Sequence, residues 1–119
     1  MYVNKVNIEE LVGKCITSIS DSRIECTDGT IFTIDHIQDC CEHTTVSPIR
    51  GDVREMFHSP VTHARKVVDN APEGGTRTTF YIRTDTGSVD IEWIVESNGY
   101  YSESVDVWKT DPINEHNSD

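Results

Sequence analysis

The sequence predicts an α+β protein that is mainly antiparallel β, with a curled sheet or sandwich of roughly seven strands and two short helices. Short β-branched segments recur along the chain and are separated by turn residues. Two of them, RTTFYIRT and SVDIEWIVE, flank the turn DTG and alternate apolar with polar residues. The hydrophobic content of 35% in 119 residues suits one small core. We therefore expect a single β-rich domain over residues 1–110 and a frayed acidic tail over residues 111–119.

Two short helices are expected between the strands. The segment VNIEELVG has Asn7 as a candidate N-cap and Gly13 as a stop. In the segment RGDVREMF, Asp52 is followed three residues later by Glu55, which is the spacing of a capping box.

The first strands, CITSIS, RIECTD and TIFTID, carry an argument about register. If RIECTD and TIFTID were joined by a two-residue loop, apolar residues of one strand would pair with polar residues of the other. If Gly29 is instead the left-handed residue of a three-residue loop, Ile24 pairs with Phe32 and Cys26 with Thr30. This register places the apolar side chains on one face, so we prefer it and expect Cys26 to be a core thiol.

The strongest strand signal lies in the second half of the chain. PVTHARKVV is expected to be a strand after Pro60, and NAPEGGT a flexible loop. A four-residue loop at residues 84–87 then pairs Ile82 with Val89, Phe80 with Ile91 and Thr78 with Trp93, which puts the apolar residues on one face. The opposite face is predicted to carry Arg77, Tyr81, Arg83, Asp90, Glu92 and Glu96. A last strand, YSESVDVW, should follow the turn at residues 98–99.

Charge and hydropathy exclude some classes of function. The net charge is −11, and residues 85–119 hold nine acidic residues and one base. This acidic third repels phosphate backbones, so direct nucleic-acid binding is not expected. The acidity serves either solubility or a surface that mimics DNA or docks on a basic partner. No segment has the length of a membrane span or the form of a signal peptide, so we expect a cytosolic protein with reduced cysteines.

The motif HIQDCCEH contains the candidate metal ligands His36, Cys40, Cys41 and His43. The pattern is weak for zinc, because adjacent cysteines in a strand point to opposite faces and no second ligand pair completes a site. It is also weak for a nucleophile, because Asp39 and Glu42 would raise the pKa of the thiols. We therefore interpret the motif as architecture, and we expect no metal, no catalytic residue and no cofactor.

The motif ESNGYYSESVD combines tyrosines, serines and acids around a turn, a composition typical of recognition loops. We predict a binding site here that comprises Asn98, Tyr100, Tyr101, Ser102, Glu103, Arg77 and Arg83. The alternation of Val105 and Val107 places Glu103 on the core-facing side, where a carboxylate needs a partner. Its partner is predicted to be water at the open end of the sheet, Arg77 or Arg83 across a bulge, or one of Arg50, Arg54 and His36.

Both motifs resemble those of a group of small bacteriophage-encoded domains of unknown function. The shared pattern comprises GK, HxQDCCE, SP and SNGYYSESV, and it covers residues 11–107 of this chain. His43 departs from the pattern, which has an aliphatic or polar residue there. The resemblance implies a phage protein that acts in the cytoplasm of an infected bacterial host, and it assigns no catalytic residue.

Three classes of function follow. The first is a non-enzymatic accessory protein that binds and inhibits or redirects a host factor, such as a defence protein. The second is a sponge for a small cyclic nucleotide signal, using Trp93, Tyr100, Tyr101, Arg77 and Arg83. The third is a metal- or thiol-dependent hydrolase that uses residues 36–43. An unpaired edge strand would also allow a homo-oligomer, by pairing with a second copy.

Overall fold

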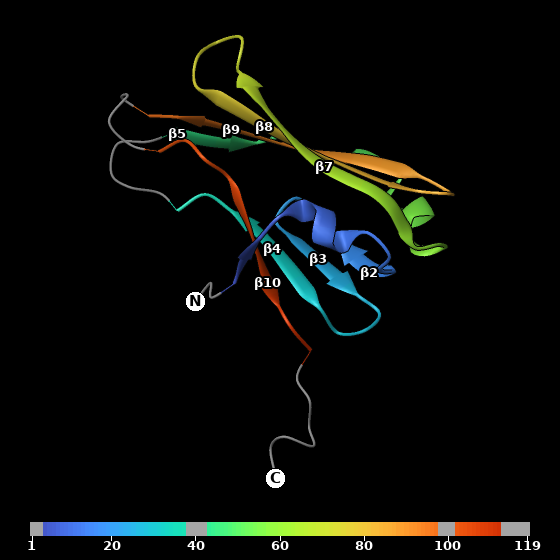
Figure 1. Cartoon of the computed structure of the whole chain (residues 1–119). Coiled ribbons are helices and arrows are strands. Elements are labelled where there is room, and N and C mark those ends of the chain that lie inside the picture. Colours follow the sequence, from blue (N-terminus) through green and yellow to red (C-terminus); the bar gives the residue numbers. More distant parts are fainter. Residues whose placement is uncertain (1–3, 38–42, 98–101, 113–119) are drawn as a thin grey trace.

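The computed structural model describes residues 4–37, 43–97 and 102–112. Two antiparallel sheets face each other as a sandwich (Figure 1), which confirms the predicted fold class. One sheet has the strand order β1-β10-β4-β3-β2, and the other has the order β5-β9-β8-β7 with β6 also paired to β9. The strands are β1 (Lys5–Val6), β2 (Ile16–Ile19), β3 (Arg23–Cys26), β4 (Ile31–Asp35), β5 (His43–Val46), β6 (Arg50–Gly51), β7 (Val61–Asn70), β8 (Thr76–Thr84), β9 (Ser88–Glu96) and β10 (Asp106–Thr110).

The ten described strands exceed the roughly seven predicted by β1, β5 and β6. β1 and β6 span only two residues each, and β5, with the sequence HTTV, has a single apolar residue, so none of them shows an alternation to detect. The last strand also begins later than predicted. Residues 102–105 precede β10 and are tied by side-chain hydrogen bonds, while β10 pairs with β1 and β4. Val105 and Val107 are buried, as the alternation predicted.

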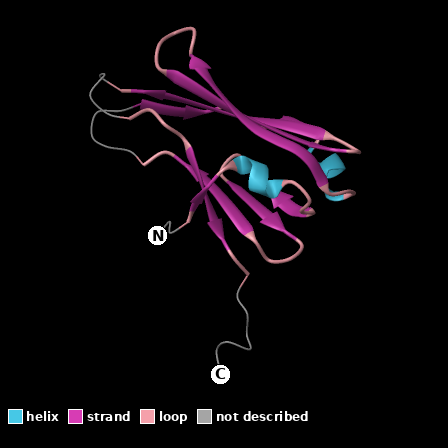
Figure 2. Ribbon diagram, in the orientation of Figure 1, coloured by secondary structure: helices cyan, strands magenta, loops and turns pink. Residues whose placement is uncertain are grey.

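Both predicted helices are single 3₁₀ turns, η1 (Ile8–Leu11) and η2 (Val53–Phe57), as Figure 2 shows. Helices this short gain little from their own hydrogen bonds, so packing determines their form. Asp52 caps η2 by accepting a hydrogen bond from the Arg54 amide, whereas the side chain of Asn7 makes no cap bond to η1. Among the described residues, no helix is long and apolar enough to cross a membrane.

The structure confirms the predicted registers of both hairpins. Ile24 lies opposite Phe32, and the Cys26 amide donates to the Thr30 carbonyl at 2.9 Å. Cys26 is buried, so it is the core thiol that the register implied. In the later hairpin the pairs are Ile82 with Val89, Phe80 with Ile91 and Thr78 with Trp93, as predicted.

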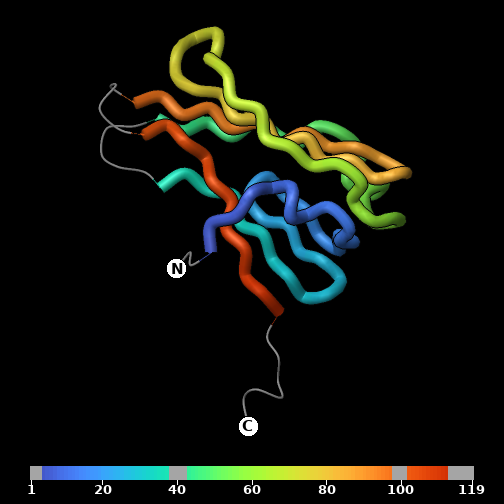
Figure 3. The backbone as a smooth tube through the Cα atoms, in the orientation of Figure 1, coloured from blue at the N-terminus to red at the C-terminus, as the bar shows by residue number. Residues whose placement is uncertain are grey.

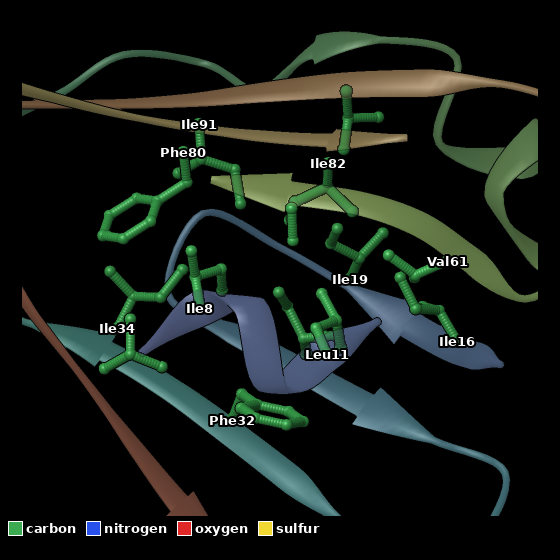
Figure 4. Packing of buried hydrophobic residues seen from close by; sticks show 14 of the residues in the cluster. Ile8, Leu11, Ile16, Ile19, Phe32, Ile34, Val61, Phe80, Ile82 and Ile91 are labelled. Atoms are coloured by element: carbon green, nitrogen blue, oxygen red, sulfur yellow. The ribbon is translucent and has the colours of Figure 1, made fainter. Parts of the chain in front are cut away.

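The core fills the space between the two sheets (Figure 4). Phe80, Ile82 and Ile91 extend from β8 and β9 towards Phe32 and Ile34 on β4. The buried side chains of η1, Ile8 and Leu11, lie between these two sets. Burial of large apolar side chains on both inner faces provides the main stabilisation of such a sandwich.

The outer face of the β7-β8-β9 sheet is polar. Every second residue is buried in β9 and in β8 from Thr78 on, and the alternate residues carry the outward positions as predicted, although Thr79 among them is also buried. The register of β7 places His63 beside Arg83, Arg65 beside Tyr81 and Asp69 beside Arg77. This face therefore gathers charged residues from three strands.

Candidate functional site

The two sequence motifs lead to the same end of the sandwich. In Figure 1 and Figure 3, β4 ends, β5 begins and β9 ends at this end. His43 at the start of β5 pairs with Glu96 at the end of β9. We call the described part of this region the motif end, and define it as residues 36–37, 43, 96–97 and 102–104.

Glu103 joins the two sheets at the motif end. Its Oε1 accepts a hydrogen bond from the Thr76 hydroxyl at the start of β8. Its Oε2 accepts from the Ser97 amide at 2.9 Å and from the Ser97 hydroxyl at 2.8 Å. The hydrogen bond from Thr76, then those from Ser97, lower the pKa of Glu103, and the nearby His36 adds to this effect. Glu103 is therefore an ionised structural acceptor at neutral pH.

His36 is the second group that holds the motif end together. It follows β4, its exposed fraction is 7%, and its Nδ1 lies 2.6 Å from the Ser104 carbonyl oxygen. A carbonyl only accepts, so Nδ1 carries the proton and donates. This bond fixes the chain between Glu103 and β10 against the end of β4.

The structure answers the question of Glu103's partners. Among the described residues the hydrogen-bond donors are Thr76 and Ser97, and the predicted partner His36 acts on the carboxylate through its charge. Among the described residues no arginine pairs with Glu103, so the predicted arginine partner is not found there, and contact of this half-buried carboxylate with water stays a prediction. Thr76 and Ser97 were missed because their role depends on which strand ends meet across the two sheets.

The predicted binding residues occupy two separate regions. Ser102 is exposed at the motif end and donates to the Ser104 hydroxyl at 3.0 Å. Arg77 pairs with Asp69 at 2.9 and 2.6 Å, which raises the pKa of its guanidinium. Arg83 lies at the other end of β8, roughly 20 Å from Arg77 by strand geometry. Asn98, Tyr100 and Tyr101 lie outside the described residues.

The candidate metal ligands do not form a described site. His36 is buried against Ser104, whereas His43 is exposed on β5. Cys40 and Cys41 lie outside the described residues. Within the described ranges, no group of three or more His, Cys, Asp or Glu residues is placed to hold a metal ion.

The sequence comparison agrees with this architecture. A family model described as a domain of unknown function, DUF7448, matches residues 9–107, from η1 into β10. The chain belongs to the DUF7448 family. No curated protein and no solved structure matched it. Membership of DUF7448 fits the unknown-function group that the motifs resemble, while phage origin remains a prediction.

Proposed function

We propose that this chain is a non-enzymatic accessory protein of bacteriophage origin that binds a host protein, such as a defence component, in the infected cell. The observation that carries the proposal is the use of Glu103 and His36 as structural groups. An acid and a histidine close together are candidates for acid–base chemistry. Here one carboxylate accepts three hydrogen bonds and the histidine donates to a main-chain carbonyl. The motif end therefore supports display of a surface better than turnover of a substrate.

An exposed apolar side chain at the motif end gives this surface an anchor. Ile37 is 59% exposed and follows the buried His36 directly. Exposed Ser102 and the exposed pair of His43 and Glu96 lie in the same region. An apolar anchor with a polar rim is the usual anatomy of a protein-binding surface. The expected partner presents an apolar pocket with basic or hydroxyl groups around it.

The test is capture of partners from bacterial cells with the wild-type chain and two matched variants. Ile37→Asp places a charge on the proposed anchor, whereas Val68→Asp places the same charge on β7, where the native side chain is 56% exposed. We expect the wild type and Val68→Asp to enrich the same host protein, and Ile37→Asp to reduce its recovery about tenfold or more. The captured protein should bind the purified chain directly.

Equal recovery with Ile37→Asp would refute the proposed surface. Conversion of a small-molecule or peptide substrate by the purified chain, lost in Glu103→Gln but retained in Glu25→Gln, would refute the non-enzymatic role. The salt dependence of the complex with the captured protein shows whether the acidic residues of the chain contribute to binding, because salt screens contacts between exposed charges. A complex that weakens with salt has a basic partner, and a salt-insensitive complex depends on Ile37.

A further inference from the structure

A pocket apart from the motif end is lined by residues of β7 and β8 and by Val12, which follows η1. Its volume is about 450 Å³, which falls within the range of roughly 300–1,000 Å³ typical of small-molecule sites. Its apolar lining consists of Val12, Ala64 and Tyr81. Its polar lining consists of Thr62, His63, Arg65 and Arg83.

The charges in this pocket differ from those in the rest of the chain. Eight of the ten lysines and arginines form ion pairs with carboxylates. Arg65 and Arg83 form none with the residues that the structure describes, although the chain has 21 acidic residues. Both of these arginines line the same pocket. Within the described part of this acidic chain, positive charge without an ion-pair partner therefore gathers at this pocket.

Strand pairing brings the two guanidinium groups within reach of one ligand. Arg65 lies opposite Tyr81, and Arg83 lies opposite His63, so the arginines are diagonal neighbours on one face. Diagonal neighbours are about 7–8 Å apart, a span that long side chains bridge. The Arg65 guanidinium carbon lies 5.2 Å from the centre of the Tyr81 ring, and this contact orients the planar group. Asp90, which lies opposite Tyr81 on β9, forms no ion pair with either arginine.

A neighbouring pocket on the same face shows the contrast. It is smaller, about 220 Å³, and it shares Tyr81 with the first. Its two arginines are both compensated, Arg77 by Asp69 and Arg50 by Glu92. The described residues therefore supply carboxylates to the arginines of the smaller pocket and none to those of the larger one.

We propose that the pocket lined by Arg65, Tyr81 and Arg83 binds the phosphate group of a small ligand. The class of ligand that fits it best is a mononucleotide. Two guanidinium forks match the oxygen geometry of phosphate. The Thr62 hydroxyl donates to the Arg83 carbonyl oxygen at 3.2 Å and lies 3.0 Å from His63 Nδ1, so these two side chains hold this wall of the pocket in place. The wall formed by Val12, which is 46% exposed, and Ala64 contacts the remainder of the ligand. A polynucleotide is not expected to bind, because the net charge of −11 repels its extended phosphate backbone.

Calorimetric or NMR titration with AMP, inorganic phosphate and adenosine tests the proposal at low ionic strength. We expect saturable binding of AMP, weaker binding of phosphate and no binding of adenosine. Arg83→Ala and Arg65→Ala should each weaken AMP binding about tenfold or more, since a charged hydrogen bond is lost. Arg23→Ala, which removes an arginine paired with Glu25 on the other sheet, should leave the affinity unchanged.

Arg83→Lys separates charge from geometry, because lysine keeps the charge and loses the fork. It should bind AMP more weakly than the wild type and more tightly than Arg83→Ala. Amide spectra establish that each variant is folded before its affinity is compared. No saturable binding of AMP, equal binding of adenosine and AMP, equal loss in Arg23→Ala, or tighter binding of a DNA oligonucleotide than of AMP would each overturn the proposal. None of these outcomes depends on a host protein, so the test is independent of the proposed function.

Discussion

Replacement of Glu103 by glutamine tests the central feature of the motif end. The carboxylate accepts from Thr76 on one oxygen and from the amide and hydroxyl of Ser97 on the other. Glutamine keeps one acceptor oxygen and places an NH₂ donor where the second acceptor was, so one set of donors loses its partner. A hydrogen bond to a charged group contributes roughly 1.5–3 kcal/mol. Partial exposure of Glu103 lowers the expected loss to about 2 kcal/mol for the site.

Urea denaturation at neutral pH measures this loss as a change in the free energy of unfolding. A loss of about 2 kcal/mol corresponds to a fall in the midpoint of thermal unfolding of roughly 8 °C for a domain of this size. Glu25→Gln is the matched control, because Glu25 forms an exposed pair with Arg23 and such pairs contribute about 0–1 kcal/mol. A double-mutant cycle of Glu103→Gln with Thr76→Val should give a coupling of about 1 kcal/mol.

The pH dependence of the same variant has a defined sign. The pKa of Glu103 is lowered in the folded protein, so its stabilising contribution is complete above the unfolded-state pKa of about 4.3 and is lost as the pH falls through the lower folded value. The difference between wild type and Glu103→Gln should therefore shrink in acid. A difference below about 0.5 kcal/mol at neutral pH, or one that is independent of pH, would refute the structural role of this carboxylate.

Three further predictions concern the framework. Gly51 has φ +109°, and an added Cβ would lie 2.2 Å from the Ser88 carbonyl oxygen, whereas Gly13 has φ +91° with nothing within 4 Å. Alanine at Gly13 should cost about 1 kcal/mol of unfolding free energy and alanine at Gly51 clearly more; equal costs in urea titrations would contradict the clash. Burial, then the charge of Asp28, raises the pKa of the Cys26 thiol to about 11, so alkylation of the native protein near pH ~8 should spare it in peptide mass mapping, and rapid modification would contradict its burial. Finally, β7 is a ten-residue edge strand, so we expect light scattering to detect a dimer through it at high concentration, and a monomeric mass throughout would contradict this.

The sequence predicted the structure best where two strands that are consecutive in the chain pair with each other. The registers of both hairpins follow from the rule that alternate residues share a face, together with the length of the connecting turn. Cys26 and Trp93 could be placed in the core on that basis, and both are buried. The outward-facing set with Arg77, Tyr81 and Arg83 followed from the same alternation.

Contacts between distant segments were beyond the reach of this reasoning. Alternation shows which side of a strand faces inward, but not which sheet the strand joins. The pairing of β10 with β4, and of β5 with β9, therefore could not be predicted. The partners of Glu103 depend on those pairings, because Thr76 begins β8 and Ser97 directly follows β9, both strands of the other sheet. The acidic residues of β9 and β10 likewise belong to different sheets, so the acidity of the C-terminal third does not form a single sheet face.

The motif end and the pocket lined by Arg65, Tyr81 and Arg83 lie at opposite ends of β8. This separation allows their roles to be tested independently. Thr76 begins the strand at the motif end, and Arg83 lies seven residues further on, beside the pocket. At the rise of a β-strand these positions are roughly 23 Å apart, well beyond the ~7–10 Å over which substitutions usually interact. Loss of AMP binding in Glu103→Gln would therefore reflect a loosened domain, because no ligand contact is removed. Loss of host-protein capture in Arg83→Ala, with AMP binding also lost, would instead indicate that ligand occupancy of the pocket controls the binding surface.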